Sequence, residues 1–394
     1  MRRFAQASAA VAALLALAAC QNPTGVGVGL LDEDAANPAL RTVTATTTDT
    51  TEATLITAGF ASAQSAQPQR RVLTGRVQDA RFGDAVATAY IDAVQPSNLP
   101  DGFEGATATS VTLELLRDYA YGDTTSVLPI EIRRQLGNWG PEGLPGDTVL
   151  ATGDLITTVD VDLSAADSLV TITLPADFLA ANPTLFTGSD FGTAFEGFAL
   201  SVADMGNPMP GAVVGFDMFS SRSRLRVATA QDTVTYPLAE VYTLLTQSAP
   251  TMPPADIVPY RSGAPTALAI GLDLSSVGTV PLARAVLSLP LDRSVAREGS
   301  FVRPIPAAVG VFGVSASGTR TFLSDLSTTV AGDPRTVSSA AITLATQSLL
   351  LGQPSFDHLE IVFRPSPLSL DVFPVGRVGT DRAPRLLLTV VTPA

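Results

Sequence analysis

The side chains that most often carry out chemistry are scarce in this chain of 394 residues, which has one histidine, His358, and one cysteine, Cys20. His358 follows Asp357 at the predicted start of a strand, so a Ser-His-Asp hydrolase site is one interpretation. Hydrolases of one large class hold the serine in a Gly-x-Ser-x-Gly turn, and no stretch of this sequence has that pattern. We therefore predict a structural role for His358. The residue counts also exclude metal sites built from histidine and cysteine.

Calcium needs only oxygen ligands, so groups of aspartates are the remaining candidates for a metal site. These groups are Asp160 and Asp162 with Asp167 nearby, and the Gly-Asp-Thr turns at Asp123 and Asp147. The sequence has no calcium loop with a central glycine and a closing glutamate, and Asp-Thr pairs are common in turns. We predict ordinary turns at these positions, with no metal and no other cofactor.

Two carboxylates far apart in sequence can together hydrolyse a glycosidic bond, so a glycoside hydrolase stays open as an alternative. A sugar site would also be expected to use aromatic platforms, and the chain has one tryptophan, Trp139, and six tyrosines. Trp139, in the run Gly137-Asn138-Trp139-Gly140-Pro141, is the one candidate ligand-binding residue. A core residue and a clamp in a loop are the ordinary interpretations of Trp139, and core packing is the favoured one. No catalytic residue can be assigned.

The N-terminal residues give the clearest functional signal. Met1-Arg2-Arg3 precedes an apolar, alanine-rich run from Ala9 to Ala19, which is the arrangement of a secretory signal. The apolar run has about a dozen residues, and a membrane-spanning helix needs roughly 20, so a transmembrane anchor is disfavoured. An ordinary cleaved signal peptide followed by a chance cysteine is the remaining alternative.

The end of this run, Leu15-Ala16-Leu17-Ala18-Ala19-Cys20, resembles the lipobox of bacterial lipoproteins. The resemblance implies a signal peptide over residues 1–19, cleavage before Cys20 and lipidation of the Cys20 thiol. More than one acyl chain on Cys20 would give stable anchoring to a membrane. Residues 20–40 then form a flexible, lipidated tether. By the family's sorting rule Gln21 favours the outer membrane, so we expect a cell-envelope protein on the periplasmic or the exposed face.

Composition narrows the classes of partner. The net charge is −13, and all 24 basic residues are arginines. The sequence has no basic patch to neutralise phosphates, which argues against nucleic acid as a partner. Hydrophobic residues make up 46% of the chain and charged residues 15%, so a large core can form without disulfides.

Short runs with alternating apolar residues predict an all-β protein. In residues 109–116 the side chains of Val111, Leu113 and Leu115 fall on one face, and in residues 127–133 those of Leu128, Ile130 and Ile132 do. Pro129 would remove one ladder hydrogen bond, which suggests an edge strand or a bulge. The best helix candidate is short, over residues 175–181. Strands spaced by turn residues favour antiparallel sandwiches, while no amphipathic helices separate them as in parallel α/β folds.

The second half of the chain repeats features of the first. Residues 109–115 resemble residues 283–289, and the strands and basic turn over 197–227 resemble those over 358–388. We therefore predict two antiparallel, jelly-roll-like β-sandwich domains, at residues 41–231 and 232–394. The segment 236–246 would be the first strand of the second domain, although a short helix over 237–247 is the alternative.

Two families resemble parts of the chain. Residues 28–34, the stretch from Gly75 through Phe82-Gly83-Asp84 to Tyr90, and residues 121–125 resemble envelope lipoproteins catalogued as domain of unknown function 4270. That resemblance implies an anchored, acidic, all-β protein over residues 20–230. Residues 271–277, 285–289 and 382–390 are similar to jelly-roll modules of the DNRLRE type, some of which are classed as carbohydrate-binding. The aromatic Trp-and-Thr strand of that module is missing here.

From these observations we expect an envelope-anchored lipoprotein that acts as a non-catalytic binding or structural module. Its partners would be the membrane, through the lipid on Cys20, and a polysaccharide or an envelope protein. The alternatives are a carbohydrate-binding module and a carboxylate-based glycoside hydrolase that acts on extracellular polysaccharide.

Overall fold

The computed structural model describes most of the chain after the predicted tether. The described residues are 39–51, 58–62, 70–137, 139–140, 144, 147–165, 168–203, 211–263, 267–329, 334–352, 356–364 and 367–392. The predicted signal peptide, Cys20 and most of the predicted tether lie outside them. The described residues form an all-β fold, as predicted, in which every paired strand is antiparallel to its neighbours. In these residues no helix is long and apolar enough to cross a membrane.

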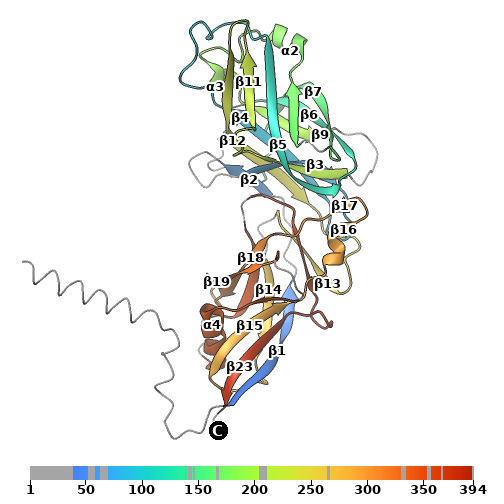
Figure 1. The fold of residues 1–394 in the computed structure, drawn as a ribbon, viewed down its shortest axis with the longest axis vertical. Helices are drawn as coiled ribbons and strands as arrows, with labels where there is room; N and C mark the ends of the chain where they lie inside the picture. The colour runs from blue at the N-terminus through green and yellow to red at the C-terminus, as the bar shows by residue number, and fades with distance from the viewer. Residues whose placement is uncertain are drawn as a thin grey trace, which may run out of the picture.

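The strands form two bodies stacked end to end (Figure 1). The first body is mainly built from the strands β2 (Ala58–Ser62), β3 (Arg71–Val77), β4 (Ala85–Ala93), β5 (Ser110–Asp123), β6 (Val127–Gln135), β7 (Thr152–Asp162), β8 (Leu169–Thr173), β9 (Phe198–Val202), β10 (Gly211–Asp217), β11 (Arg224–Ala228) and β12 (Thr233–Gln247). The helices α2 (Ala176–Ala181) and α3 (Phe191–Ala194) belong to the same body.

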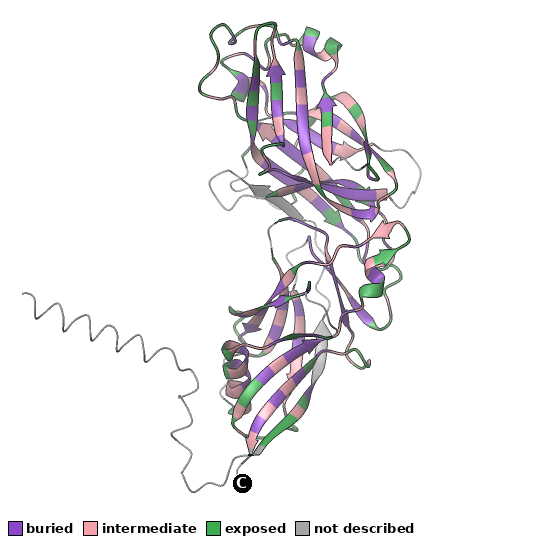
Figure 2. Ribbon diagram, in the orientation of Figure 1, coloured by how far each residue is buried: buried purple, intermediate pink, exposed green. Residues whose placement is uncertain are grey.

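Two long strands, β5 and β12, hold the first body together. The first half of β5 pairs with β8 and β11, and its second half pairs with β10. β12 likewise pairs first with β11 and then with β4 and β2. Each strand therefore crosses from one sheet to the other, which is how orthogonally packed sheets make their corners. The sheets enclose a core that includes Val111, Leu113, Leu115, Ile130 and Ile132, all on the faces predicted for them (Figure 2).

The second body takes its first strand from the start of the chain. Its elements are β1 (Ala39–Thr51), β13 (Ile257–Arg261), β14 (Ala267–Asp273), β15 (Leu282–Leu289), β18 (Ala308–Val314), β19 (Arg320–Ser327), β20 (Arg335–Val337), α4 (Ala340–Leu350), β21 (His358–Phe363), β22 (Val372–Gly376) and β23 (Arg385–Thr392). The short turn η2 (Arg293–Ala296) and the strands β16 (Arg297–Glu298) and β17 (Phe301–Val302) reach towards the first body, where β17 pairs with β5.

The two bodies have the same strand order. For eight strands of the first body it is β7-β6-β9-β4-β12-β11-β5-β8, and in the second body it is β19-β18-β21-β14-β1-β23-β15-β20. The first body has β2, β3 and β10 in addition, of which β10 and β3 connect β5 to β4 and β2 pairs with β12. The predicted repeat also keeps its register, because Leu225 lies opposite Leu113 and Leu386 lies opposite Leu287. A helix follows the edge strand in both bodies, α2 after β8 and α4 after β20. The chain therefore contains one β architecture twice.

The predicted domain boundary between residues 231 and 232 is wrong. Residues 233–247 form a strand, not a helix, and this strand belongs to the first body. In the second body the equivalent position, between β14 and β23, is filled by β1, although the predicted boundary places these residues in the first domain. Alternating apolar residues show that a segment is a strand, but they do not show which sheet it joins.

Two local predictions had different outcomes. The short helix was correctly placed, because α2 begins after Pro175 at Ala176. β6 is neither an edge strand nor bulged at Pro129, because β6 lies between β7 and β9. Its ladder with β9 begins only at Ile130, and Pro129 uses just its carbonyl, which accepts a hydrogen bond from the Ala203 amide. The missing N–H of Pro129 is therefore not needed on that side.

Candidate functional site

The first candidate site is the joint between the two bodies, where apolar side chains from both form one buried cluster. The first body contributes Leu73, Val77, Ala85, Tyr121 and Leu245, among others, and the second contributes Ile257, Val295, Leu368, Leu370 and Val372. The two-stranded ribbon of β13 and β22 lies between the bodies. Its side chains alternate, so Tyr260 and Phe373 enter the core of the second body while Ile257 and Val372 enter the joint. The joint is therefore packed like a protein interior.

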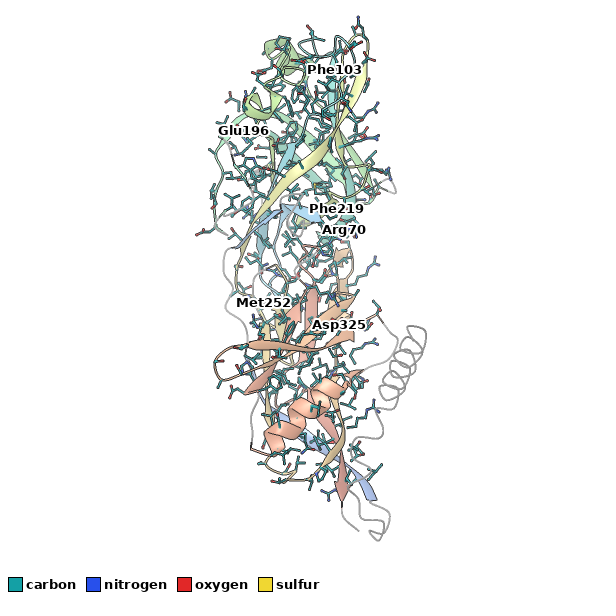
Figure 3. The ribbon with its side chains drawn as sticks, turned by 90° about the vertical axis from the view of Figure 1, so that its left-hand side faces the viewer. Arg70, Phe103, Glu196, Phe219, Met252 and Asp325 are labelled. Carbon is teal, nitrogen blue, oxygen red and sulfur yellow. The ribbon has the colours of Figure 1, made fainter. Side chains whose placement is uncertain are left out.

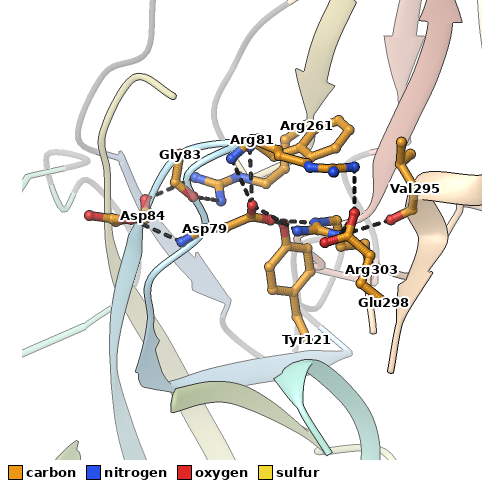
Figure 4. Close-up of polar contacts among 10 residues, drawn as sticks. Asp79, Arg81, Gly83, Asp84, Tyr121, Arg261, Val295, Glu298 and Arg303 are labelled. Carbon is orange, nitrogen blue, oxygen red and sulfur yellow. Dashed lines mark hydrogen bonds and ion pairs between the residues drawn. The ribbon is translucent and has the colours of Figure 1, made fainter. Parts of the chain in front are cut away.

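A buried ion pair lies within this joint (Figure 4). The Nε of Arg303 donates to Oδ2 of Asp79 at 2.6 Å, and its NH2 group donates to Oδ1 at 3.0 Å. The exposed fraction of the side chain is 0% for Asp79 and 5% for Arg303. Two parallel hydrogen bonds of this kind fix both the distance and the angle between the partners. Because Asp79 belongs to the first body and Arg303 to the second, the pair locks their relative position.

Neighbouring groups keep the Asp79 carboxylate ionised. Burial acts to raise the pKa of Asp79, but hydrogen bonds from Arg303 and from the Tyr121 hydroxyl outweigh burial and leave that pKa below its ordinary value. The Tyr121 hydroxyl donates to Oδ2 at 2.5 Å, and burial raises the pKa of this phenol. The guanidinium of Arg303 also lies 4.5 Å from the centre of the Phe301 ring. The buried charges are thus paired and hydrogen-bonded, as burial requires.

More polar contacts cross the joint around this pair. Arg261, which is 2% exposed, donates to the carbonyls of Gly83 and Asp84 in the first body. Arg71 forms a bidentate pair with Asp118, at 2.7 and 2.6 Å, and also donates to the Leu368 carbonyl at 3.0 Å. Because these groups face each other within the joint and bond to protein partners, they hold the bodies together.

The second candidate site is an aromatic cluster on the outer face of the first body. Trp139 packs there with Tyr90 and Tyr242, whose ring centres lie 5.7 Å apart. The Trp139 indole donates to the Glu196 carbonyl at 2.9 Å, and the Trp139 residue is only 7% exposed. The favoured interpretation of Trp139, packing, therefore agrees with the structure. Trp139 does not present an open platform for a sugar ring.

Three carboxylates, Asp92, Glu196 and Glu240, lie close to this aromatic cluster. Asp92 follows Tyr90 on the same face of β4, and the shift in register of β12 places Glu240 close to it. Burial, with smaller contributions from the charges of Glu240 and Glu196, raises the pKa of Asp92 to about 7. A carboxyl group with such a pKa can donate or accept a proton near neutral pH. No sequence pattern predicts this group of carboxylates, because its members come from three separate segments.

The other residues that the sequence singled out form ordinary contacts. His358 begins β21, and its ring nitrogens lie 3.1 Å from Asp357 and 3.5 Å from Glu360. Asp123 accepts hydrogen bonds from Thr125, and Asp162 accepts them from Ser164, so both close local turns as predicted. Asp167 lies outside the described residues. Among the residues that are described, no group of three or more histidine, cysteine or acidic side chains could hold a metal ion.

Comparisons with known proteins add little to this geometry. No family model matches the chain, and no curated protein matches it. Among solved structures, it is similar to the crystal structure of a putative secreted protein from Parabacteroides distasonis, with 7% sequence identity and a TM-score of 0.22. The similarity covers 84% of this chain and 99% of that one. A likeness of this extent carries no argument about function.

Proposed function

We propose that the protein is a lipid-anchored, extracytoplasmic β module that holds its first body away from the membrane as a binding or structural element. The observation that carries this proposal is the order of the parts along the chain. The predicted lipid on Cys20 is followed by the predicted tether, and the tether leads directly into β1 of the second body. The first body then lies beyond the joint, at the far end from β1 (Figure 1).

The packed joint supports a spacer role. An apolar cluster combined with a buried bidentate ion pair resists bending between the bodies, so a displacement of one is passed to the other. The loops at the far end, around residues 97–106 and 229–232, would then meet a partner at a fixed distance from the second body. A label on Phe103 in Figure 3 marks this end.

Two measurements test the proposal. Mass spectrometry of the exported protein should find an acylated Cys20 at the N-terminus, and Cys20→Ser should release the protein from membranes. A photo-crosslinker at Gln231, in the far loop, should capture a polysaccharide or an envelope protein, whereas one at Thr321 in the second body should not. An unmodified Cys20 thiol in the exported protein would refute the anchor, and equal capture from both positions would refute display by the first body.

A carboxylate-based glycoside hydrolase is the second candidate function, and the raised pKa of Asp92 favours it, since a general acid needs such a pKa. The test is release of reducing sugar from envelope polysaccharides by the wild-type protein and by Asp92→Asn. Activity that Asp92→Asn abolishes while the fold is retained would support the enzyme. Equal activity of the two proteins, or none in either, would refute it.

A further inference from the structure

Among the described residues, one surface at an end of the second body has no acidic side chain of its own, although the chain as a whole has a net charge of −13. This acid-free face consists of Leu40 and Arg41 at the start of β1, the loop 274–281, and α4 with Leu351 at its end. α4 has no charged residue at all, in the sequence Ala-Ala-Ile-Thr-Leu-Ala-Thr-Gln-Ser-Leu-Leu. The charged groups at this face are the exposed Arg41 and, on the neighbouring strand, Arg284. At its border the Asp273 carboxylate accepts hydrogen bonds from Ser275 of the loop.

Hydrogen bonds join these segments into one continuous surface. Gln347 of α4 donates to the Val280 carbonyl at 3.2 Å, and the Val391 amide donates to the Pro281 carbonyl at 2.9 Å. Val391 in turn lies opposite Leu40 in the ladder between β23 and β1. The end of α4, the loop and the start of β1 therefore lie together at one end of the second body.

Large apolar side chains point outward from this surface. The exposed fractions are 70% for Leu344, 51% for Leu351 and 65% for Leu40. The inward side of α4 is used for packing, because Ile342 and Ala345 are part of the core of the second body. Leu344 and Leu351 are seven residues apart, which places them on the same side of the helix. Such a grouping on a protein surface indicates a contact with an apolar partner.

The position of the predicted anchor identifies that partner. Eighteen residues, 21–38, connect Cys20 to Ala39, so the predicted tether spans at most about 65 Å and ends at the acid-free face. A tether of this length keeps the face at a high effective concentration next to the bilayer, so even a weak contact is populated. Leucines can enter the boundary between headgroups and acyl chains, while arginines bind anionic headgroups.

From these observations we infer that the acid-free face is a docking surface for the lipid bilayer, with α4 lying against the headgroup region. The inference rests on the proposed function, because the lipid on Cys20 brings the face to the membrane. Docking would set the tilt of the whole protein, since the joint makes the two bodies move together. The membrane contact would then be made by the anchor and by α4, with the far loops left free.

The test uses the acylated full-length mature protein in vesicles of phosphatidylethanolamine and phosphatidylglycerol that contain brominated acyl chains. Cys20 is the sole native thiol and is blocked by lipid, so a thiol-reactive fluorophore attaches only to an introduced cysteine. One variant carries Leu351→Cys, and the control carries Met252→Cys, which is 69% exposed and lies near the joint (Figure 3). We expect bromine to quench the label at 351 and not the label at 252, and Leu344→Glu to abolish the quenching at 351.

The outcomes separate this inference from the function on which it rests. Equal fluorescence at 351 and 252 in protein that stays with the vesicles would overturn docking and leave the anchor intact. Quenching at 351 that persists with Leu344→Glu would also overturn docking. So would a label at 351 that becomes buried in the absence of lipid, because a second copy of the protein would then cover the face. A mass spectrum with an unmodified Cys20 would instead overturn the anchor, and docking with it.

Discussion

The buried pair of Asp79 and Arg303 gives the sharpest prediction, because the chain contains a matched exposed pair. In both pairs the Nε of an arginine donates to a carboxylate, at 2.6 Å for Arg303 and Asp79 and at 2.5 Å for Arg320 and Glu360. The arginine side chain is 5% exposed in the first pair and 52% exposed in the second. The pairs also differ in a second hydrogen bond, which the NH2 group of Arg303 donates to Oδ1 of Asp79, so a difference between the two substitutions reports on burial together with bidentate pairing.

Arg303→Met should lower the free energy of unfolding by about 3–5 kcal/mol, because it leaves the Asp79 carboxylate charged and buried without its partner. Arg320→Met should cost less than about 1 kcal/mol, because solvent screens the exposed pair. Adding Asp79→Asn to Arg303→Met should recover part of the loss, since the unpaired charge is removed. The measurement is urea unfolding, followed by circular dichroism for both bodies and by the fluorescence of Trp139 for the first.

The pH dependence gives an independent check. The pKa of Asp79 is below its ordinary value of 3.8 in the folded protein, so the unfolded chain takes up the proton first as the pH falls. The pair therefore contributes its full stability above about pH 4, and the contribution is lost as the pH falls through the folded pKa. Arg303→Met should remove this acid-dependent loss. Equal costs for Arg303→Met and Arg320→Met, with the same acid dependence, would refute the role assigned to the joint.

Other predictions concern single residues. Asp92→Asn should stabilise the protein at pH 8. Because the pKa of Asp92 is raised to about 7 in the folded protein, the wild-type protein loses stability as the pH rises from about 4 to 7. The loss is at most about 4 kcal/mol, at about 1.36 kcal/mol per pKa unit. Thermal unfolding at pH 5 and pH 8 checks this, and an unchanged pH profile would contradict it. Gly122→Ala should lower the free energy of unfolding by more than about 2 kcal/mol, because φ is +111° and the new Cβ would lie 2.5 Å from the Gly211 carbonyl oxygen. Gly105→Ala should lower it by about 1 kcal/mol, because φ is +73° but no atom lies within 4 Å of the new Cβ. Denaturant titrations measure both values. Ala45→Asp, at a fully buried position of β1 opposite Leu386, should unfold the second body and leave the Trp139 fluorescence of the first body unchanged; a protein with both bodies intact would contradict the place of β1.

The sequence predicted the strands well, because their signal is local. Alternation in residues 109–116 correctly predicted that Val111, Leu113 and Leu115 lie in the core. α4 was missed, because its apolar residues are not confined to one side and no charged residue marks its ends. The domain boundary was wrong because the pairing of β1 with β23 joins residues more than three hundred positions apart. No local pattern encodes such a pairing.

The polar groups of the two candidate sites were predicted less well for the same reason. Asp79 and Arg303 are separated by 224 positions, and neither has a distinctive neighbour in the sequence. Asp92 looks like an ordinary strand residue until β12 and the segment before β9 bring Glu240 and Glu196 near it. Trp139 was noticed because it is the single tryptophan, and its favoured interpretation as a packing residue agrees with its burial. Residue type alone was informative only where the residue was rare.

The insertion of the first body between β1 and β13 also affects how the protein responds to proteases. The chain passes between the bodies twice, once between Thr51 and Ala58 and again between Gln247 and Ile257. A single cut in the second crossing would leave every fragment covalently attached to β1 or hydrogen-bonded to it. Separating the first body from β1 would take a cut in each crossing, or one cut in the first crossing followed by extraction of β1 from between β14 and β23.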